Sequence, residues 1–207
     1  MSLGGTQAHL TCPDLPPLVR TAAEAAAAAG FGESCLPEQG RLLALLAAGV
    51  GHGRIGETGT GCGVGLAWLT AGATPGAHLV SIDHDGQRAA AARAVFDGRP
   101  ADGPPVRILS GDWAELSAYG PFDLLVLDGG GQGKGDRPPI EVADWLRPGG
   151  LVVLDDFTPF TTWPPVYEGR PDAPRLHWLR HERLLSCEIP LRPGAATIVG
   201  RYLGVPS

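Results

Sequence analysis

Residues 54–69 read Arg54-Ile55-Gly56-Glu57-Thr58-Gly59-Thr60-Gly61-Cys62-Gly63-Val64-Gly65-Leu66-Ala67-Trp68-Leu69, and this stretch decides the fold. A short strand-like segment with an acid near its end meets a loop of alternating glycines, and an apolar helical segment follows. Strand, glycine loop and helix in this order are typical of the first unit of a nucleotide-binding α/β domain. The glycines allow a ligand close to the backbone, and the free N–H groups at the helix start favour an anionic ligand group.

The spacing of the glycines argues against a dinucleotide. The fingerprint Gly-x-Gly-x-x-Gly needs glycine or alanine at its third position, which is Leu66 counted from Gly61 and Val64 counted from Gly59. The loop instead resembles motif I of the class I S-adenosylmethionine-dependent methyltransferases, in which an acid precedes the glycines. This resemblance implies a cofactor site whose residues include Glu57, Gly59, Thr60, Gly61 and Gly63.

Length and composition are those of an ordinary globular protein. A chain of 207 residues suits one α/β domain, and 43% apolar with 18% charged residues is an average balance. The net charge of −6 argues against a nucleic-acid backbone as partner, because such binders carry a basic face. The four cysteines are scattered, and the first residues lack the features of a signal peptide, so we expect reduced thiols and a cytoplasmic protein without a membrane span.

Hydrophobic periodicity predicts an alternation of helices and strands. Parallel strands are expected at residues 78–83, 106–110, 122–128 and 151–157, and two further strands at 184–189 and 196–203, joined through Pro193-Gly194. Helices are expected at residues 18–29, 37–48, 87–96, 114–119, 140–146 and 175–183, with a turn at 147–150.

Two further segments extend the resemblance to nearly the whole chain from about Leu36. Residues 146–153, Leu-Arg-Pro-Gly-Gly-Leu-Val-Val, are a recognisable methyltransferase segment. The fold implied is a Rossmann-like α/β methyltransferase fold with a seven-stranded, mostly parallel sheet in the order 3-2-1-4-5-7-6. Residues 33–42 resemble the segment that closes over the methionine end of the cofactor in cation-dependent O-methyltransferases, the catechol and caffeoyl-CoA group. We therefore expect one domain, 1–207, in which residues 1–49 cap the site and residues 50–207 form the core.

Polar residues at the strand ends suggest how the cofactor is held. Asp83 ends the second strand, where an acid can accept hydrogen bonds from both ribose hydroxyls. The neighbouring His84 is expected near the adenine face. In the resembled family the acid equivalent to Asp112 meets the adenine amine and an apolar neighbour, here Trp113, flanks the ring; Asp112 can equally cap the following helix.

Three acids, Asp128, Asp155 and Asp156, are expected at adjacent strand ends. They would repel one another unless a cation or protons compensate, and oxygen ligands of this kind suit Mg²⁺ or Mn²⁺. The resembled enzymes hold a metal with Asp, Asp and Asn, so Asp156 departs from the pattern by adding a charge. The resemblance also makes Asp128 a residue of the cofactor and catalytic site, and makes Lys134 a candidate base, displaced here by several glycines.

The predicted function is methyl transfer to an oxygen of a small organic acceptor, with residues 157–174 and their aromatic side chains forming part of the acceptor pocket or a homodimer contact. The alternatives are a metal-independent methyltransferase, a nicotinamide-dependent oxidoreductase, a non-catalytic cofactor-binding module and a nucleic-acid methyltransferase. The last is disfavoured because residues 128–131, Asp-Gly-Gly-Gly, lack the expected Asn/Asp-Pro-Pro-aromatic tetrad.

Overall fold

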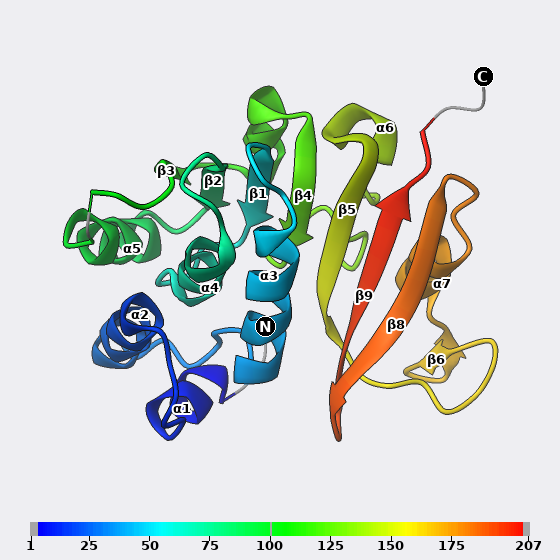
Figure 1. Cartoon of the computed structure of the whole chain (residues 1–207). Coiled ribbons are helices and arrows are strands. Elements are labelled where there is room, and N and C mark those ends of the chain that lie inside the picture. Colours follow the sequence, from blue (N-terminus) through cyan, green and yellow to red (C-terminus); the bar gives the residue numbers. More distant parts are fainter. Residues whose placement is uncertain (1–3, 100, 205–207) are drawn as a thin grey trace.

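The computed structural model describes residues 4–99 and 101–204 and contains a seven-stranded sheet in the order β3-β2-β1-β4-β5-β9-β8 (Figure 1). The first five strands are parallel, and the pairs β5–β9 and β8–β9 are antiparallel. Because two short strands, β6 and β7, precede the terminal pair, this order is the one predicted, and the predicted fold class is confirmed. The strands are β1 (Arg54–Thr58), β2 (His78–Asp83), β3 (Val106–Ser110), β4 (Phe122–Leu127), β5 (Leu146–Phe157), β6 (Val166–Tyr167), β7 (Arg170–Pro171), β8 (Leu184–Arg192) and β9 (Ala195–Tyr202).

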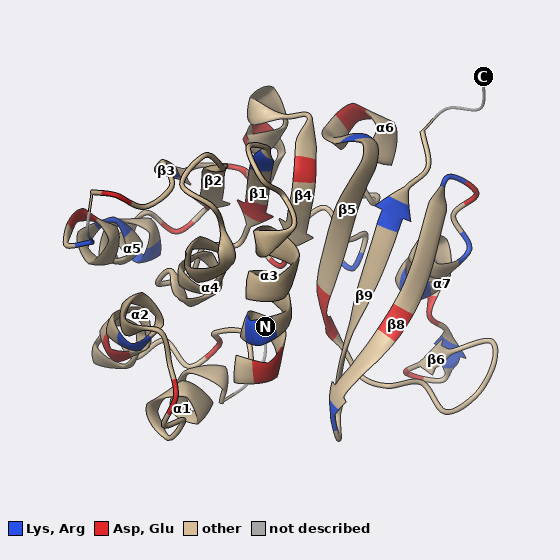
Figure 2. Cartoon of the chain, in the orientation of Figure 1, with Lys and Arg blue, Asp and Glu red and all other residues tan. Residues whose placement is uncertain are grey.

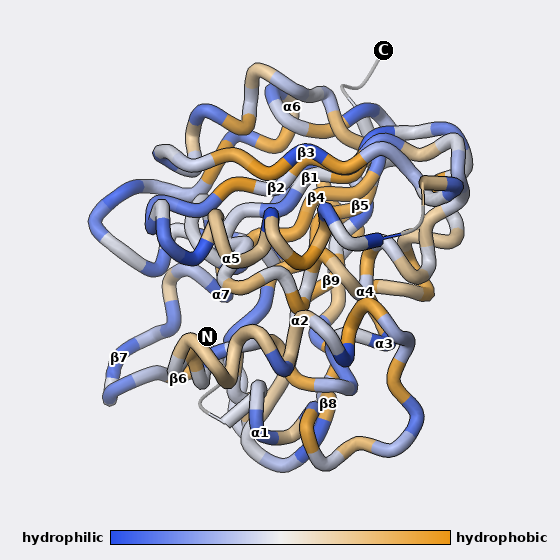
Figure 3. Tube along the Cα trace, turned by 90° about the vertical axis from the view of Figure 1, so that its left-hand side faces the viewer, coloured by the Kyte–Doolittle hydropathy of each residue, from blue (hydrophilic) through white to orange (hydrophobic). Residues whose placement is uncertain are grey.

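Helices cover both faces of the sheet. They are α1 (Gly5–Leu10), α2 (Pro17–Ala28), α3 (Pro37–Ala48), α4 (Val64–Gly72), α5 (Gly86–Asp97), the 3₁₀ helix η1 (Trp113–Tyr119), α6 (Val142–Trp145) and α7 (Ala173–Leu179). Alternate residues of β4 serve the two faces: Leu124 and Val126 pack with α2, α3 and α4, whereas Leu125 and Leu127 pack with η1, α6 and α7. Figure 3 shows the hydrophobic strand segments in the interior between these helices.

The amino-terminal helices are tied to the core by polar contacts as well as by packing. His9 on α1 is fully buried; its Nδ1 lies 2.9 Å from the Gly5 carbonyl, and its Nε2 accepts a hydrogen bond of 2.9 Å from Trp68 Nε1 on α4. Burial lowers the pKa of His9, which favours the neutral ring that this contact requires. Thr6 of α1 donates to the Phe31 carbonyl at 2.7 Å, which attaches the loop between α2 and α3, residues 29–36, to α1.

Several boundaries differ from the sequence-based expectations. The helix expected at 140–146 is the single turn α6, because Arg147 precedes Pro148 and is disfavoured in the helical region, so the chain is already extended at Leu146. The turn expected at 147–150 is an irregular part of β5, and α7 ends at Leu179 instead of residue 183. Helix α1 and the β6–β7 hairpin had no counterpart among the predicted elements.

The register brings the polar strand ends to one edge of the sheet. Thr58 pairs with Ile82 on one side and with Leu127 on the other, and Leu127 pairs with Leu154. Residues that follow these positions therefore meet at the carboxyl edge, where ligands bind in open α/β sheets. Figure 2 shows acidic segments at the ends of β1 and β5, while Lys and Arg are spread over many elements.

Within the described ranges, no helix combines the length and apolar character needed to span a membrane. Cys12, Cys35, Cys62 and Cys187 are free thiols.

Candidate functional site

The glycine loop lies tightly between the ends of β1 and β4. Gly59 has φ +88°, and a Cβ atom there would lie 2.5 Å from the backbone nitrogen of Gly129. The amides of Asp128 and Gly129 both donate to the Thr58 carbonyl, at 3.1 and 2.7 Å. The glycine at position 59 is thus required by close backbone approach as well as by conformation.

Asp83 holds this loop from the neighbouring strand. The side chain is 5% exposed, and its two oxygens accept hydrogen bonds from the backbone amides of Gly61, at 2.7 Å, and Asp85, at 2.9 Å. A carboxylate offers about four acceptor positions, so both oxygens can still accept from ligand hydroxyls. Asp83 lines two adjoining cavities, which is the position expected for a ribose-binding acid.

Glu57 lies beneath the loop rather than on its open side. It is 2% exposed, and its carboxyl group accepts a hydrogen bond from Ser81 Oγ, which also contacts Thr60 Oγ1, both at 2.5 Å. Burial raises the pKa of Glu57 to about 8 despite the hydrogen bond from Ser81. Neither adjoining cavity has Glu57 or Gly63 in its lining; the position of Gly63 faces Ala92 and Phe96 of α5. Glu57 and Gly63 therefore pack behind the loop, whereas Gly59, Thr60 and Gly61 line the cavity on the amino-terminal side; the cofactor role of these five residues stays a prediction.

The residues expected around adenine line the larger cavity, of about 590 Å³. Trp113 packs against Trp145 with ring centroids 6.1 Å apart, and the imidazole of His84 is 75% exposed at the rim. Asp112 caps η1 through the amide of Ala114 and its carboxylate also receives two hydrogen bonds, of 2.7 and 2.6 Å, from Arg137. The expected cap is therefore present, and the arginine was not foreseen.

Arg137 changes the electrostatics of this end of the cavity. Its guanidinium lies 5.4 Å from the centre of a Trp113 ring, and its two hydrogen bonds lower the pKa of Asp112 to about 2. The residue follows β4 in a glycine-rich loop that sequence patterns mark only as flexible. An adenine amine at Asp112 would share the carboxylate with this guanidinium.

The three predicted metal-ligating acids do converge. One ligand atom from each of Asp128, Asp155 and Asp156 can be chosen so that all lie within 4.8 Å of one another. No described residue forms a hydrogen bond with the buried Asp128 Oδ1, whereas Asp155 Oδ1 accepts from the amide of Asp156 at 2.8 Å. Burial raises the pKa of both Asp128 and Asp155, and for Asp128 the charge of Asp155 adds to the effect. The donor set, all carboxylate oxygens with one unsatisfied, fits a hard divalent cation.

Asp156 has φ +65°, in the left-handed region. Among residues with a side chain, Asn and Asp adopt this conformation most readily. Aspartate in place of the asparagine of the resembled enzymes therefore keeps the backbone geometry and adds a charge.

Lys134 reaches this cluster despite the intervening glycines. Its Nζ donates to the backbone carbonyls of Asp155 and Asp156, at 2.6 and 2.7 Å, and lies 3.8 Å from the centre of the Phe157 ring. Desolvation of the ammonium lowers the pKa of Lys134 to about 8, although the residue as a whole is exposed. Gln132 braces the same loop by donating to the carbonyl of Leu127, a support that no local pattern indicated.

A third cavity, of about 610 Å³, adjoins the acids on the side of the β6–β7 hairpin. Lys134 and Asp156 belong to the walls of both this cavity and the one beside Trp113. Its floor includes Arg175, 3% exposed and paired with Asp172 at 3.1 Å. Of the aromatic residues expected here, Tyr167 lines the cavity, whereas Trp163 stacks with Arg180 at 4.9 Å.

Comparison with known proteins agrees with this geometry. Residues 57–157 match a family described as a methyltransferase domain. The chain is 30% identical over 134 residues to a catechol O-methyltransferase of Niastella koreensis, which covers 59% of this chain and 58% of that protein. The family resemblance predicted from the residues is thus confirmed, while the chain spans less than two thirds of the length of the curated relatives it matches.

Solved structures share the fold over nearly the whole chain. An O-methyltransferase of Streptomyces achromogenes involved in tomaymycin synthesis, in complex with SAM, superposes with a TM-score of 0.71 at 19% identity and covers 97% of this chain and 96% of its own. An O-methyltransferase of Bacillus cereus in complex with SAH gives 0.69 at 18% identity, with 96% of both chains covered. At these identities the likeness establishes the fold.

Proposed function

We propose that the class I methyltransferase domain of this chain transfers a methyl group from S-adenosylmethionine to an oxygen of a small organic acceptor. The observation that carries the proposal is the continuity of three cavities along the carboxyl edge of the sheet. The first two share Gly59, Asp83 and Asp128, and the second and third share Lys134 and Asp156. A methyl donor in the first two would thus lie beside an acceptor in the third.

The cofactor roles follow from this arrangement. The glycine loop contacts the part of the ligand that lies against the backbone. Asp83 accepts hydrogen bonds from the ribose hydroxyls, and His84 and Trp113 flank the adenine. Asp112 is held ionised and oriented by Arg137, so it is ready to accept from the exocyclic amine.

For the acid cluster we propose a divalent-cation site made by Asp128, Asp155 and Asp156. Such an ion lowers the pKa of an acceptor hydroxyl and orients its oxygen. The chain itself provides three carboxylates, of which Asp128 has a buried oxygen that no described residue hydrogen-bonds, and β5 and the loop after β4 fix their positions. Lys134 lies at the boundary of the acceptor cavity, where an amine with a pKa of about 8 can take a proton from a hydroxyl.

The acceptor cavity favours a flat organic molecule with neighbouring oxygens. Tyr167 and Phe157 supply apolar surface, and the shared wall with Asp156 places the polar end of the acceptor at the acids. This is the acceptor chemistry named for the Niastella relative, and we extend it to this chain as a proposal.

A metal-independent methyltransferase is the second candidate, and Lys134 favours it. The ammonium bonded to the carbonyls of Asp155 and Asp156 already supplies one positive charge beside the cluster. In that case the enzyme would align donor and acceptor and exclude water without a bound ion.

The proposal is tested first by calorimetric titration with S-adenosylhomocysteine and, separately, with NADH. Binding of the first and none of the second is expected; the reverse would reject the proposed function. Methylation of a catechol is then measured with EDTA and after adding Mg²⁺. Activity lost with EDTA and restored by Mg²⁺ supports the cation site, whereas activity that ignores the chelator assigns the metal-independent mechanism.

A further inference from the structure

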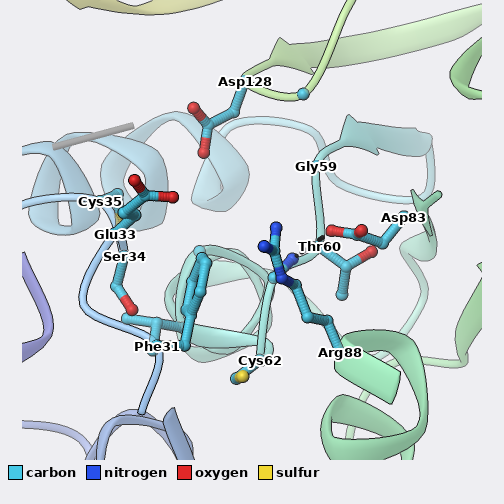
Figure 4. A pocket seen from close by; sticks show the side chains of 14 residues that line it. Phe31, Glu33, Ser34, Cys35, Gly59, Thr60, Cys62, Asp83, Arg88 and Asp128 are labelled. Carbon is cyan, nitrogen blue, oxygen red and sulfur yellow. Dashed lines mark hydrogen bonds between the residues drawn. The ribbon is translucent and has the colours of Figure 1, made fainter. Parts of the chain in front are cut away.

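One basic side chain points into the cavity on the amino-terminal side of the glycine loop. Arg88, in the first turn of α5, directs its guanidinium between the Phe31 ring and the loop residue Thr60 (Figure 4). The guanidinium carbon lies 4.7 Å from the centre of the Phe31 ring. Arg88 is the one Lys or Arg among the residues lining this cavity, whereas Glu33, Asp83 and Asp128 contribute carboxylates to it.

The guanidinium retains free hydrogen-bonding capacity. Its Nε lies 3.4 Å from a carboxylate oxygen of Asp85, and the side chain is 30% exposed. An arginine carries five N–H donors in a planar fork, and among the described residues this is the only polar partner of the guanidinium, so the terminal nitrogens can bind a second group. Asp83, the acid closest in sequence on the cavity side, already accepts from two backbone amides.

Phe31 is a fixed support for this guanidinium. Its amide donates to the Ala26 carbonyl at 2.9 Å, and its carbonyl accepts from Thr6 Oγ1 at 2.7 Å. The ring lies over Gly61, where a Cβ atom would be 2.9 Å from it. The ring and Arg88 together connect the loop after α2 to α5 across the opening of the cavity.

The charges in this cavity match an amino-acid zwitterion attached to a sulfonium. The methionyl end of S-adenosylmethionine carries two positive centres, the ammonium and the sulfonium, and one negative centre, the carboxylate. The lining offers Arg88 as a positive partner for the carboxylate, and carboxylates, among them Glu33, as partners for the cationic centres. Arginine binds carboxylates through two parallel hydrogen bonds, which fixes orientation as well as charge.

We propose that Arg88 binds the α-carboxylate of the cofactor and that Phe31 holds its guanidinium in place. The inference rests on the proposed function and adds a residue that the glycine motif does not include. In this arrangement the amino-acid part of the cofactor, rather than its nucleoside, binds at the contact between α5 and the amino-terminal segment.

The test uses two ligands that differ at the proposed contact. S-Adenosylhomocysteine has the amino-acid group, whereas 5′-methylthioadenosine keeps the nucleoside and sulfur and lacks it. Loss of a charge-assisted pair predicts that Arg88→Ala weakens S-adenosylhomocysteine binding by about ten- to a hundredfold while methylthioadenosine changes by less than about twofold. Arg88→Lys, which keeps the charge without the fork, should fall between wild type and Arg88→Ala for the first ligand.

Arg93→Ala is the matched control, because Arg93 lies on the same helix and donates to the Ile108 carbonyl at 3.0 Å on β3. It should leave the ratio of the two affinities unchanged. Equal loss of both ligands in Arg88→Ala would show a merely structural role and overturn the inference, as would unchanged binding of both. If wild type binds neither ligand, the proposed function itself fails, and that result is distinct from either outcome.

Discussion

The glycine loop and the acid cluster lie side by side at one edge of the sheet, yet their carboxyl groups are satisfied differently. Around the loop, Asp83 accepts from two backbone amides and Glu57 is bonded to Ser81. In the cluster, no described residue forms a hydrogen bond with the buried Oδ1 of Asp128, and the nearby Lys134 donates to backbone carbonyls. The carboxyl groups around the loop are therefore held by protein groups, whereas Asp128 has an oxygen available to a ligand.

The largest expected effect is on the loop. Gly61→Val should abolish S-adenosylhomocysteine binding, because position 61 has φ +52° and a Cβ there would already lie 2.9 Å from the Phe31 ring. Calorimetry measures the binding, and circular dichroism checks that the fold persists. Normal affinity in a folded variant would show that the glycine loop does not bind the cofactor. The proposed difference between the loop and the acid cluster would then be wrong.

The next effect is on the cluster. Asp155→Ala should remove Mg²⁺-dependent activity while leaving S-adenosylhomocysteine affinity within about twofold, since Asp155 lines neither of the two proposed cofactor cavities. Activity and calorimetry on the same preparation separate the two functions. A parallel loss of cofactor binding would show that the acid cluster also contributes to cofactor affinity.

A smaller effect is expected for the acid that we propose to bind the ribose. Asp83→Ala should weaken S-adenosylhomocysteine by roughly ten- to a hundredfold, because a charged hydrogen bond contributes about 1.5–3 kcal/mol. Asp97→Ala, at the end of α5, serves as a surface control. Unchanged affinity of folded Asp83→Ala would leave that carboxylate as a loop support alone.

Glu57, the acid behind the loop, should affect the free energy of unfolding rather than cofactor affinity. The pKa of Glu57 is raised from 4.5 to about 8 in the folded state. Between these two pH values the folded protein keeps the Glu57 proton, whereas the unfolded chain has lost it. Its contribution to stability is thus fully present at acidic pH and is lost as pH rises towards 8, with a limiting slope of about 1.4 kcal/mol per pH unit. Glu57→Gln should remove this slope in denaturant titrations from pH 5 to 9, and identical slopes for variant and wild type would contradict the assignment.

The smallest effect is expected at Asp156. Asp156→Asn should preserve stability within about 0.5 kcal/mol, because both residues tolerate the left-handed backbone, whereas Asp156→Val should cost about 1–3 kcal/mol. Thermal unfolding of the two variants provides the comparison. Equal losses would indicate that charge rather than backbone conformation determines the choice of residue there.

The parts of the fold that could be predicted are those that depend on patterns among neighbouring residues in the sequence. The run at 122–128 indicated a doubly buried strand, and the Pro37–Ala48 helix was found with its observed ends because proline begins it and glycine follows it. The strand-end position of Asp83, Asp128 and Asp155 followed from parallel pairing alone. Helix α1 was missed because its anchor, the His9–Trp68 hydrogen bond, joins residues 59 positions apart.

The same limit applies to the site. Arg137 meets Asp112 across 25 residues, and Arg88 on α5 meets Phe31 from the loop after α2, which is distant in sequence, so neither contact has a local signature. The motif predicts a cofactor role for Glu57, but the inward direction of its side chain depends on Ser81 on the neighbouring strand, which sequence spacing does not reveal. Long side chains in loops and helix starts are oriented by tertiary neighbours, which periodicity does not reveal.

The shared carbonyl of Thr58, which accepts from the amides of both Asp128 and Gly129, has a consequence for the sequence of ligand arrival. It joins the last residue of β1 to the first acid of the cluster without an intervening hinge. If donor and acceptor bind as proposed, a movement at the end of β1 would therefore be passed directly to Asp128. We expect any preferred order of addition, donor first or acceptor first, to depend on the outer walls of the cavities, the residues around Phe31 on one side and the β6–β7 hairpin on the other.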